Sequence, residues 1–262
     1  MSIFQEKAIV RQLEQLSEEN FLLTLFAPAT SNGARPGQFV MVGVGAANDP
    51  LLRRPFSINS VDKGGQIRLL FKVVGRGTRI LSQTREGDLL PLLGPLGTGF
   101  AIDPDKQACL VGGGMGIAPM RFLAEYLQNC QDRTVMDTVI LGGRNRDELE
   151  PLVGDFDGLD MTVLMVTDDG SFGDQGLVTD ILGPLKLGSD TIVYSCGPKP
   201  MLYAVYQCSQ KKGLSCQVSI ESVMACGMGA CLGCSVPAFA GGYLHVCTDG
   251  PVFDAEKLVW SI

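Results

Sequence analysis

The 262-residue sequence predicts three parts in order: an antiparallel β barrel, an α/β domain with a doubly wound parallel sheet, and a small cysteine-rich subdomain. Three observations predict this fold class. Short β-rich stretches separated by turn residues fill the first hundred positions, strand-like and helix-like segments alternate between 105 and 220, and four cysteines lie within the last 37 residues. We therefore place the domains at 1–101, 102–220 and 221–262.

The barrel is predicted by β-rich stretches that are separated by Asn-Gly, Pro-Gly, Lys-Gly-Gly and Glu-Gly-Asp turns. The stretches expected as strands are 21–28, 37–44, 56–61 and 66–74. Arg54 could pair bidentately with a phosphate and Ser57 could offer a hydroxyl to a ring nitrogen, although paired arginines also suit a solvated strand end. Glycine-rich segments at 75–78 and 94–100 are expected to lead out of the barrel.

Five apolar runs alternate with amphipathic stretches in the middle of the chain, which indicates parallel strands with helices on both faces of the sheet. The runs expected as strands are 108–113, 138–143, 161–169, 191–197 and 217–220. Glycines lie at the end of the first strand and just before a helix, where main-chain N–H groups could cradle a pyrophosphate; they are Gly112, Gly113, Gly114 and Gly116. Their pattern is not the standard G-x-G-x-x-G, so a simple tight turn remains an alternative.

Ligands of such sheets lie beyond the carboxyl ends of the strands. Cys196, Gly197 and a proline end the fourth strand, where small residues would let a planar ring approach. Asp168 and Asp169 lie at the end of the third strand and could either accept ribose hydroxyls or cap the next turn. The acidic residue that usually ends the second strand is absent, and Arg144 follows the glycines at that place.

Nine cysteines suggest metal or redox chemistry, because an odd number cannot all pair and a reducing compartment disfavours disulfides. The last four have the spacing C-x4-C-x2-C-x12-C, which begins like the plant-type [2Fe-2S] motif; they are Cys226, Cys231, Cys234 and Cys247. Gly227, Gly229 and Gly233 would let the chain pass close to an inorganic core and adopt positive φ values. A structural zinc site is the main alternative.

Composition excludes several classes of function. The net charge is −7 and no basic run is present, which argues against a nucleic-acid or anionic-membrane surface. The N-terminus has no signal-peptide core and no run reaches the roughly 18 apolar residues of a membrane span, so we expect a cytoplasmic protein. His245 is the one histidine; it suits a surface or packing role or a hydrogen bond to a cluster sulfur, and no second histidine is present for a hydrolase site.

The order of these motifs resembles the ferredoxin reductase superfamily, in which a barrel binds FAD and an α/β domain binds the nicotinamide nucleotide. The motifs are R-x-x-S, G-x-G-T, GPLGTGF, GGGxGxxP and CGP. The C-terminal stretches ESVMACGMGACLGC and VCTDGPVF are more specific, and they resemble the electron transfer subunits of type B dihydroorotate dehydrogenases. The resemblance extends over essentially the whole chain.

This resemblance implies a role for particular residues. Arg54 would bind the FAD pyrophosphate, and Cys196 with Gly197 would flank the nicotinamide. The other residues implied at FAD are Pro55, Phe56, Ser57, Leu70, Phe71, Lys72, Gly77 and Thr78. Phe56 stands where relatives in the superfamily often have Tyr, so a hydroxyl hydrogen bond is missing there. All four C-terminal cysteines match the ligands of a [2Fe-2S] cluster.

The resemblance also implies the reaction. Electrons would pass from an FMN-containing catalytic subunit, through [2Fe-2S] and FAD, to NAD+ in pyrimidine (UMP) biosynthesis, within a heterotetramer of two copies of each subunit. No side chain of this chain is expected to be catalytic by itself. Two alternatives remain. One is a flavin reductase that passes NADH or NADPH electrons to ferredoxin or a sulfur compound; Arg144 and Arg146 leave NADPH open, because a guanidinium can bind its 2'-phosphate. The other is a zinc-stapled binding protein without enzymatic activity. Trp260 is expected to pack or to lie at an interface.

Overall fold

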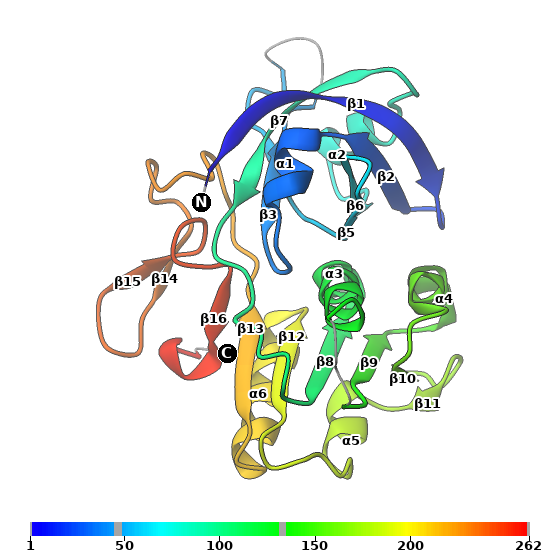
Figure 1. The fold of residues 1–262 in the computed structure, drawn as a ribbon, viewed down its shortest axis with the longest axis vertical. Helices are drawn as coiled ribbons and strands as arrows, with labels where there is room; N and C mark the ends of the chain where they lie inside the picture. Colours follow the sequence, from blue (N-terminus) through cyan, green and yellow to red (C-terminus); the bar gives the residue numbers. More distant parts are fainter. Residues whose placement is uncertain (1, 45–48, 131–134, 261–262) are drawn as a thin grey trace.

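The computed structural model describes residues 2–44, 49–130 and 135–260, and it places the three predicted parts against one another (Figure 1). The N-terminal sheet lies at one end of the molecule and the parallel sheet at the other, while the C-terminal segment runs along one side of both. No helix within these ranges is long and apolar enough to cross a lipid bilayer.

Within the described residues, seven antiparallel strands form the N-terminal sheet in the order β4-β3-β7-β1-β2-β6-β5. The strands are β1 (Phe4–Gln15), β2 (Asn20–Phe26), β3 (Phe39–Val42), β4 (Arg54–Ser57), β5 (Ser60–Val61), β6 (Gln66–Lys72) and β7 (Leu89–Leu96). Two short helices, α1 (Pro28–Gly33) and α2 (Arg76–Leu81), connect them. The sheet curls so that β4 lies opposite β6, where the rings of Phe56 and Phe71 are 5.7 Å apart.

The two longest strands of this sheet, β1 and β7, are absent from the sequence prediction. β1 alternates as a half-buried strand should, because Ala8 and Val10 are fully buried while Lys7 is exposed, but its interspersed charges mask that period. β7 includes Gly94, which was expected in a loop leading out of the barrel. A Cβ there would lie 2.7 Å from Val40 Cγ1, so glycine lets β7 pass close to β3.

The predicted doubly wound sheet is confirmed, with the order β11-β10-β9-β8-β12-β13-β16 in the described chain. Its strands are β8 (Ala108–Gly113), β9 (Thr138–Gly143), β10 (Thr162–Thr167), β11 (Asp174–Gln175), β12 (Ile192–Cys196), β13 (Ser215–Ser219) and β16 (Val252–Asp254). Its helices are α3 (Ile117–Gln128), α4 (Arg146–Val153), α5 (Val178–Leu182) and α6 (Lys199–Lys211), with 3-10 turns η1 (Gly114–Gly116) and η2 (Gly154–Phe156). The strand order reverses between β8 and β12.

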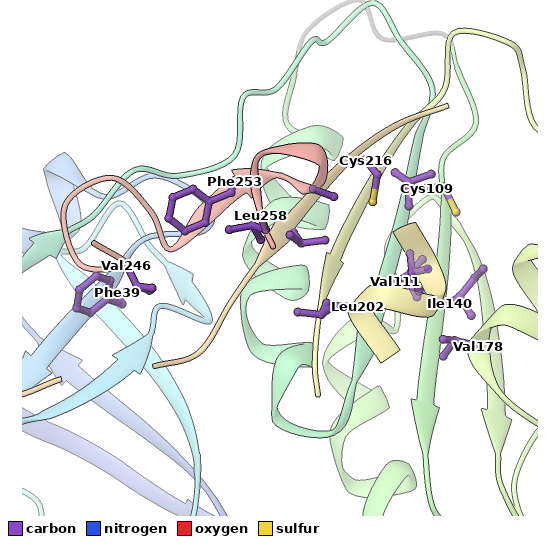
Figure 2. Close-up of a cluster of buried hydrophobic side chains, with 14 of the residues drawn as sticks. Phe39, Cys109, Val111, Ile140, Val178, Leu202, Cys216, Val246, Phe253 and Leu258 are labelled. Atoms are coloured by element: carbon purple, nitrogen blue, oxygen red, sulfur yellow. The ribbon is translucent and has the colours of Figure 1, made fainter. Parts of the chain in front are cut away.

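Hydrophobic cores lie on both faces of this sheet. Val111 of β8 packs on one face with Leu202 of α6, and Leu110, its neighbour in the strand, packs on the other face with residues of α3. The first core is continuous with the rest of the molecule, because it runs from Phe39 of β3 through Val246 and Phe253 of the C-terminal segment (Figure 2). The three parts therefore share buried surface.

The C-terminal segment forms the hairpin β14 (Ser235–Pro237) and β15 (Tyr243–His245), and then the 3-10 turn η3 (Ala255–Lys257) after β16. β16 pairs antiparallel with β13 and so adds an edge strand to the otherwise parallel sheet. Sequence analysis did not predict this pairing, because three residues with little periodicity do not identify a partner strand. The boundary at 220/221 stays a prediction.

Candidate functional site

A cavity of about 360 Å³ lies where the barrel, the parallel sheet and the C-terminal segment meet, and we call it the central cavity. Eight of the nine residues that the resemblance implies at FAD line it. They are Arg54, Pro55, Phe56, Ser57, Leu70, Phe71, Lys72 and Thr78. These residues come from β4, β6 and α2, which face one cavity because the sheet curls.

Gly77, the ninth of these residues, lies directly behind Arg54. A Cβ at Gly77 would be 2.6 Å from Arg54 Nε and 3.1 Å from its Nη2, so the missing side chain lets the guanidinium rest against the first turn of α2. Arg54 Nη1 also donates to the main-chain oxygen of Leu52. These contacts hold a cation at the wall of the central cavity.

The hydroxyl of Thr78 is engaged within its own turn. Thr78 Oγ1 accepts hydrogen bonds from the main-chain N–H groups of Val74 at 3.0 Å and Gly75 at 3.2 Å, and it donates to the oxygen of Gly75 at 3.1 Å. Any contact of this turn with a phosphate would therefore come from main-chain N–H groups of the first helical turn rather than from the hydroxyl.

The opposite wall of the central cavity includes Cys196 at the end of β12, and Met115 and Ala118 at the start of α3. Burial raises the pKa of the Cys196 thiol to about 12, so the thiol is neutral at neutral pH. Gly197 does not line this cavity; a Cβ there would lie 2.5 Å from Met201 Cε. Of the two residues expected beside a nicotinamide, Cys196 is thus the one that faces the barrel residues.

The end of β13 and the segment that joins it to the cluster cysteines complete this wall. The residues there that line the cavity are Ser219, Ile220, Glu221, Ser222 and Met224. These residues were not among the predicted site residues. Burial raises the pKa of the Glu221 carboxyl, although part of the side chain remains open to the cavity. A signal was available in the sequence, because these residues end or follow the fifth predicted strand at the carboxyl edge of the sheet, where ligands of such folds lie.

Two of the glycines expected at a pyrophosphate pack closely against neighbouring segments inside the protein, and packing rules out a side chain at one of them, Gly116. A Cβ at Gly116 would lie 2.3 Å from the main-chain oxygen of Cys196, so α3 can approach the end of β12 only without a side chain. A Cβ at Gly112 would lie 3.2 Å from Ile117 Cα. Neither glycine lines the central cavity or the second cavity described next, so their role at a nucleotide stays a prediction.

The other two glycines, Gly113 and Gly114, line a second cavity of about 380 Å³, which we call the nucleotide cavity. Gly114 has a φ of +53° with no heavy atom within 4 Å of a Cβ position, so its conformation rather than its packing favours glycine. Asp168 lines the nucleotide cavity, whereas Asp169 does not. Asp169 Oδ1 accepts hydrogen bonds from the N–H and Oγ of Ser171, so it caps the turn after β10.

The four cysteines of the C-terminal motif form two pairs. In the first pair, Cys226 Sγ accepts the main-chain N–H groups of Met228 and of Cys231, each at 3.4 Å, and the two thiols also interact. The hydrogen bond from Met228 N–H, together with those from Cys231, lowers the pKa of the Cys226 thiol to about 6, although burial opposes the shift. Cys226 is therefore mostly thiolate, the form that binds metals, at neutral pH.

The second pair, Cys234 and Cys247, is buried within the hydrophobic core. Cys247 Sγ accepts the N–H of Gly229 at 3.2 Å, and Cys234 Sγ accepts the N–H of Cys247 at 3.5 Å. Burial and the neighbouring Cys234 raise the pKa of the Cys247 thiol to about 11. Main-chain N–H groups thus point at sulfur in both pairs.

The backbone of the loop confirms two of the three glycine predictions. Gly227 has a φ of +73° and Gly229 a φ of +77°, in the left-handed region that favours glycine. The positive φ expected at Gly233 is wrong, because the neighbouring Leu232, with a φ of +57°, takes the left-handed conformation instead. The expected close approach of Gly233 to an inorganic core stays a prediction. Spacing alone could not show which of two adjacent residues reverses the chain.

The donor arrangement tests the two metal sites that the spacing allows. Among the described residues, no three His, Cys, Asp or Glu side chains converge so as to hold one metal ion. A structural zinc site needs four ligands around a single ion. A [2Fe-2S] cluster instead takes a pair of thiolates at each of two irons. The two pairs of thiols fit this arrangement of ligands.

The remaining candidates have packing contacts. His245 Nδ1 lies 3.0 Å from Ser235 Oγ in the β14–β15 hairpin, and the residue is half-buried. Trp260 stacks on the ring of Tyr206 at 5.9 Å and donates from Nε1 to the main-chain oxygen of Ala255. Trp260 therefore fastens the end of the described chain to α6, which agrees with the packing role expected for it.

Comparison with known proteins gives matches to three family models. Residues 7–100 match the oxidoreductase FAD-binding domain, residues 110–207 the oxidoreductase NAD-binding domain, and residues 221–259 the iron-sulfur cluster binding domain of dihydroorotate dehydrogenase B. The chain therefore carries binding domains for FAD, for NAD and for an iron-sulfur cluster.

Individual relatives agree over most of the chain. Electron transfer subunits of dihydroorotate dehydrogenase B (NAD(+)) are 39% identical in Geobacillus thermodenitrificans, over 98% of this chain and 99% of the relative, and 42% identical in Caldanaerobacter subterraneus subsp. tengcongensis, over 86% and 87%. Among solved structures, a chain of an NADH-dependent reduced ferredoxin-NADP oxidoreductase is 30% identical with a TM-score of 0.86, over 97% of this chain and 90% of that chain. A ferredoxin NADP+ reductase from Neisseria gonorrhoeae, 17% identical with a TM-score of 0.65 over 81% and 92%, shares the fold.

Predicted motifs, the curled sheet, the central cavity and these relatives lead to one assignment. This chain belongs to the family of electron transfer subunits of the NAD(+)-dependent dihydroorotate dehydrogenase B.

Proposed function

We propose that this chain carries electrons from an FMN-containing catalytic subunit, by way of [2Fe-2S] and FAD, to NAD+, so that dihydroorotate becomes orotate in pyrimidine biosynthesis. Dihydroorotate loses two electrons and two protons, and NAD+ takes up both electrons and one proton, which leaves one proton for solvent. The observation that carries this proposal is the composition of the central cavity: residues implied at flavin form one wall, and Cys196 with the segment leading to Cys226 forms the other.

The barrel side of the central cavity would hold FAD. When bound, FAD exchanges electron pairs with a nicotinamide and single electrons with an iron-sulfur cluster, which no side chain can do. Arg54, fixed against Gly77, would neutralise the pyrophosphate, with N–H groups from the first turn of α2 beside it. Phe56 and Phe71 would supply apolar contacts to the ring system.

Cys196 would lie beside the nicotinamide as a neutral thiol, since its pKa is raised to about 12. Gly113 and Gly114 would face the nucleotide phosphates from the first turn after β8. Cys226, Cys231, Cys234 and Cys247 would be the four cluster ligands. A cytoplasmic location stays a prediction.

The catalytic subunit would dock beside the loop formed by residues 225–234, which we call the cluster loop. Three exposed apolar side chains, Val223, Met228 and Leu232, neighbour the cluster cysteines in sequence, and Phe239 and Tyr243 are exposed in the β14–β15 region. Exposed apolar side chains of this size are typical of protein interfaces. The predicted assembly is a heterotetramer with two copies of each subunit.

The test is to co-express this chain with its candidate catalytic subunit, purify by a tag on this chain, and measure NAD+ reduction with dihydroorotate. The complex should give NADH, and Cys231→Ser should abolish NADH formation while dihydroorotate still reduces an artificial acceptor at the catalytic subunit. A complex loaded with flavin and cluster that forms no NADH from dihydroorotate would overturn the proposal.

The similarity to the NADH-dependent reduced ferredoxin-NADP oxidoreductase supports a second candidate function, transfer between a nicotinamide nucleotide and ferredoxin. The same purified complex separates the two candidates. Reduction of NAD+ by reduced ferredoxin, without any reduction by dihydroorotate, would favour the second function.

A further inference from the structure

The nucleotide cavity contains an unusual arrangement of charge. Its lining residues, all of them described in the structure, include one cation, Arg144 at the end of β9, and two carboxylates, Glu148 of α4 and Asp168 after β10. Arg146 is the second arginine that the sequence suggested for a 2'-phosphate, but it does not line the cavity. Its Nε donates to the main-chain oxygen of Ser171, and its guanidinium lies over the Phe172 ring. The choice between NAD and NADP therefore concerns Arg144 and its neighbours.

Glu148 occupies the hydrogen-bonding groups of Arg144. Glu148 Oε2 accepts from Arg144 N and from Nε, both at 2.9 Å, and Oε1 accepts from Nη2 at 3.2 Å. The side chain of Glu148 is 20% exposed, against 70% for Arg144, so the carboxylate is the fixed member of the pair. The N–H of Glu148 is itself held by Asn145 Oδ1 at 3.0 Å, at the N-cap of α4.

From the topology we expect an adenosine ribose beside this pair. Nucleotides bind across the point where the strand order reverses, here between β8 and β12, and the adenosine half extends over the neighbouring strands. Cys196 of β12 faces the central cavity, so the nicotinamide half is expected there, and the cavity at the ends of β8, β9 and β10 receives the ribose. This step rests on the proposed function.

We propose that Glu148 is the residue that makes this chain select NAD over NADP. A 2'-phosphate is normally bound by a guanidinium. Here the guanidinium of Arg144 is bound by Glu148, and Asp168 adds a second negative charge to the lining. A phosphate dianion entering the cavity would meet a net negative lining, whereas a ribose hydroxyl can donate a hydrogen bond to a carboxylate. Lys72 also acts electrostatically on Glu148, and Asp168 and Glu19 act on Arg144.

The test compares Glu148→Gln with a matched control, Glu150→Gln. Arg146 and Glu150 form the same i,i+4 pair on the same helix, at 3.0 Å, but outside the nucleotide cavity. Calorimetric titration of the flavin- and cluster-loaded complex with ADP and with adenosine 2',5'-bisphosphate measures binding without turnover. We expect Glu148→Gln to tighten binding of the 2'-phosphate compound by about tenfold or more and to change ADP binding less than about threefold. Glu150→Gln should change neither.

A double variant tests whether Arg144 is the group that binds the 2'-phosphate once the negative charge of Glu148 is removed. Adding Arg144→Gln to Glu148→Gln should remove the gain for the 2'-phosphate compound, and NADPH-dependent flavin reduction should follow the same order. The inference would be overturned if Glu148→Gln left the ratio of the affinities for adenosine 2',5'-bisphosphate and ADP unchanged, or if Glu150→Gln changed that ratio equally. The proposed function would stand in either case. Failure of the wild-type complex to bind either ADP or NADH would overturn the proposed function and this inference with it.

Discussion

Replacement of Gly227 by alanine should prevent the cluster loop from holding its iron. The φ of Gly227 is +73°, and a Cβ there would lie 2.7 Å from Met41 Cγ and 3.1 Å from Leu96 Cδ1. Both neighbours are buried, so they have little room to move. A left-handed alanine costs about 1–2 kcal/mol, and the overlap in a packed core adds about 1–3 kcal/mol. A globular protein of total stability about 5–15 kcal/mol can still fold, but this loop would shift.

Gly233→Ala is the matched control, because it makes the same change in the same loop. Gly233 does not have a left-handed φ, and its nearest contact for a Cβ is Cys231 Sγ at 3.6 Å, an ordinary van der Waals distance. Iron and acid-labile sulfide per chain, the visible absorption spectrum and the melting temperature are measured for both variants. Gly227→Ala should lose most iron and sulfide, and Gly233→Ala should keep both.

Two results would refute this reasoning about the loop. One is a Gly227→Ala protein with the iron and sulfide content and the melting temperature of the wild type. The other is equal loss of iron in Gly233→Ala, which would mean that the backbone conformation and the contact with Met41 do not determine cluster binding.

Three further predictions concern an arginine of the central cavity, a closely packed glycine and two thiols. Arg54→Gln should weaken FAD binding at least about tenfold, as measured by release of flavin fluorescence; unchanged retention would remove Arg54 from the site. Gly116→Ala should lower the free energy of unfolding in urea by about 1–3 kcal/mol, because its Cβ would overlap the main-chain oxygen of Cys196, whereas Gly154→Ala, with open space around it, should be nearly neutral. In iron-free protein, the alkylation rate of Cys226, followed by mass spectrometry, should be half-maximal near pH 6 and should decrease at lower pH as the thiolate is protonated. Cys196, with a pKa of about 12, should stay unreacted at pH 8.

Local patterns were sufficient for much of this molecule. Five of the six parallel strands in the described residues, and their helices, were predicted because each buried strand is a short apolar run and each helix has an apolar face; the exposed two-residue β11 was not predicted. The spacing of the last four cysteines predicted a metal or [2Fe-2S] site, and the iron-sulfur cluster binding domain that matches residues 221–259 includes all four of them. β1 was missed because charged residues on its exposed face interrupt the pattern that would identify it.

Contacts between distant parts of the chain were decided only by packing. Arg54 and Gly77 are in contact because the sheet curls, and no local period encodes curvature. Glu221 and Met224 line the same cavity as Phe56 because the C-terminal segment packs against both larger parts. Spacing and periodicity report the geometry of a few neighbouring residues, whereas a cavity between three parts depends on how whole surfaces fit, so the site as a whole exists only in the folded chain.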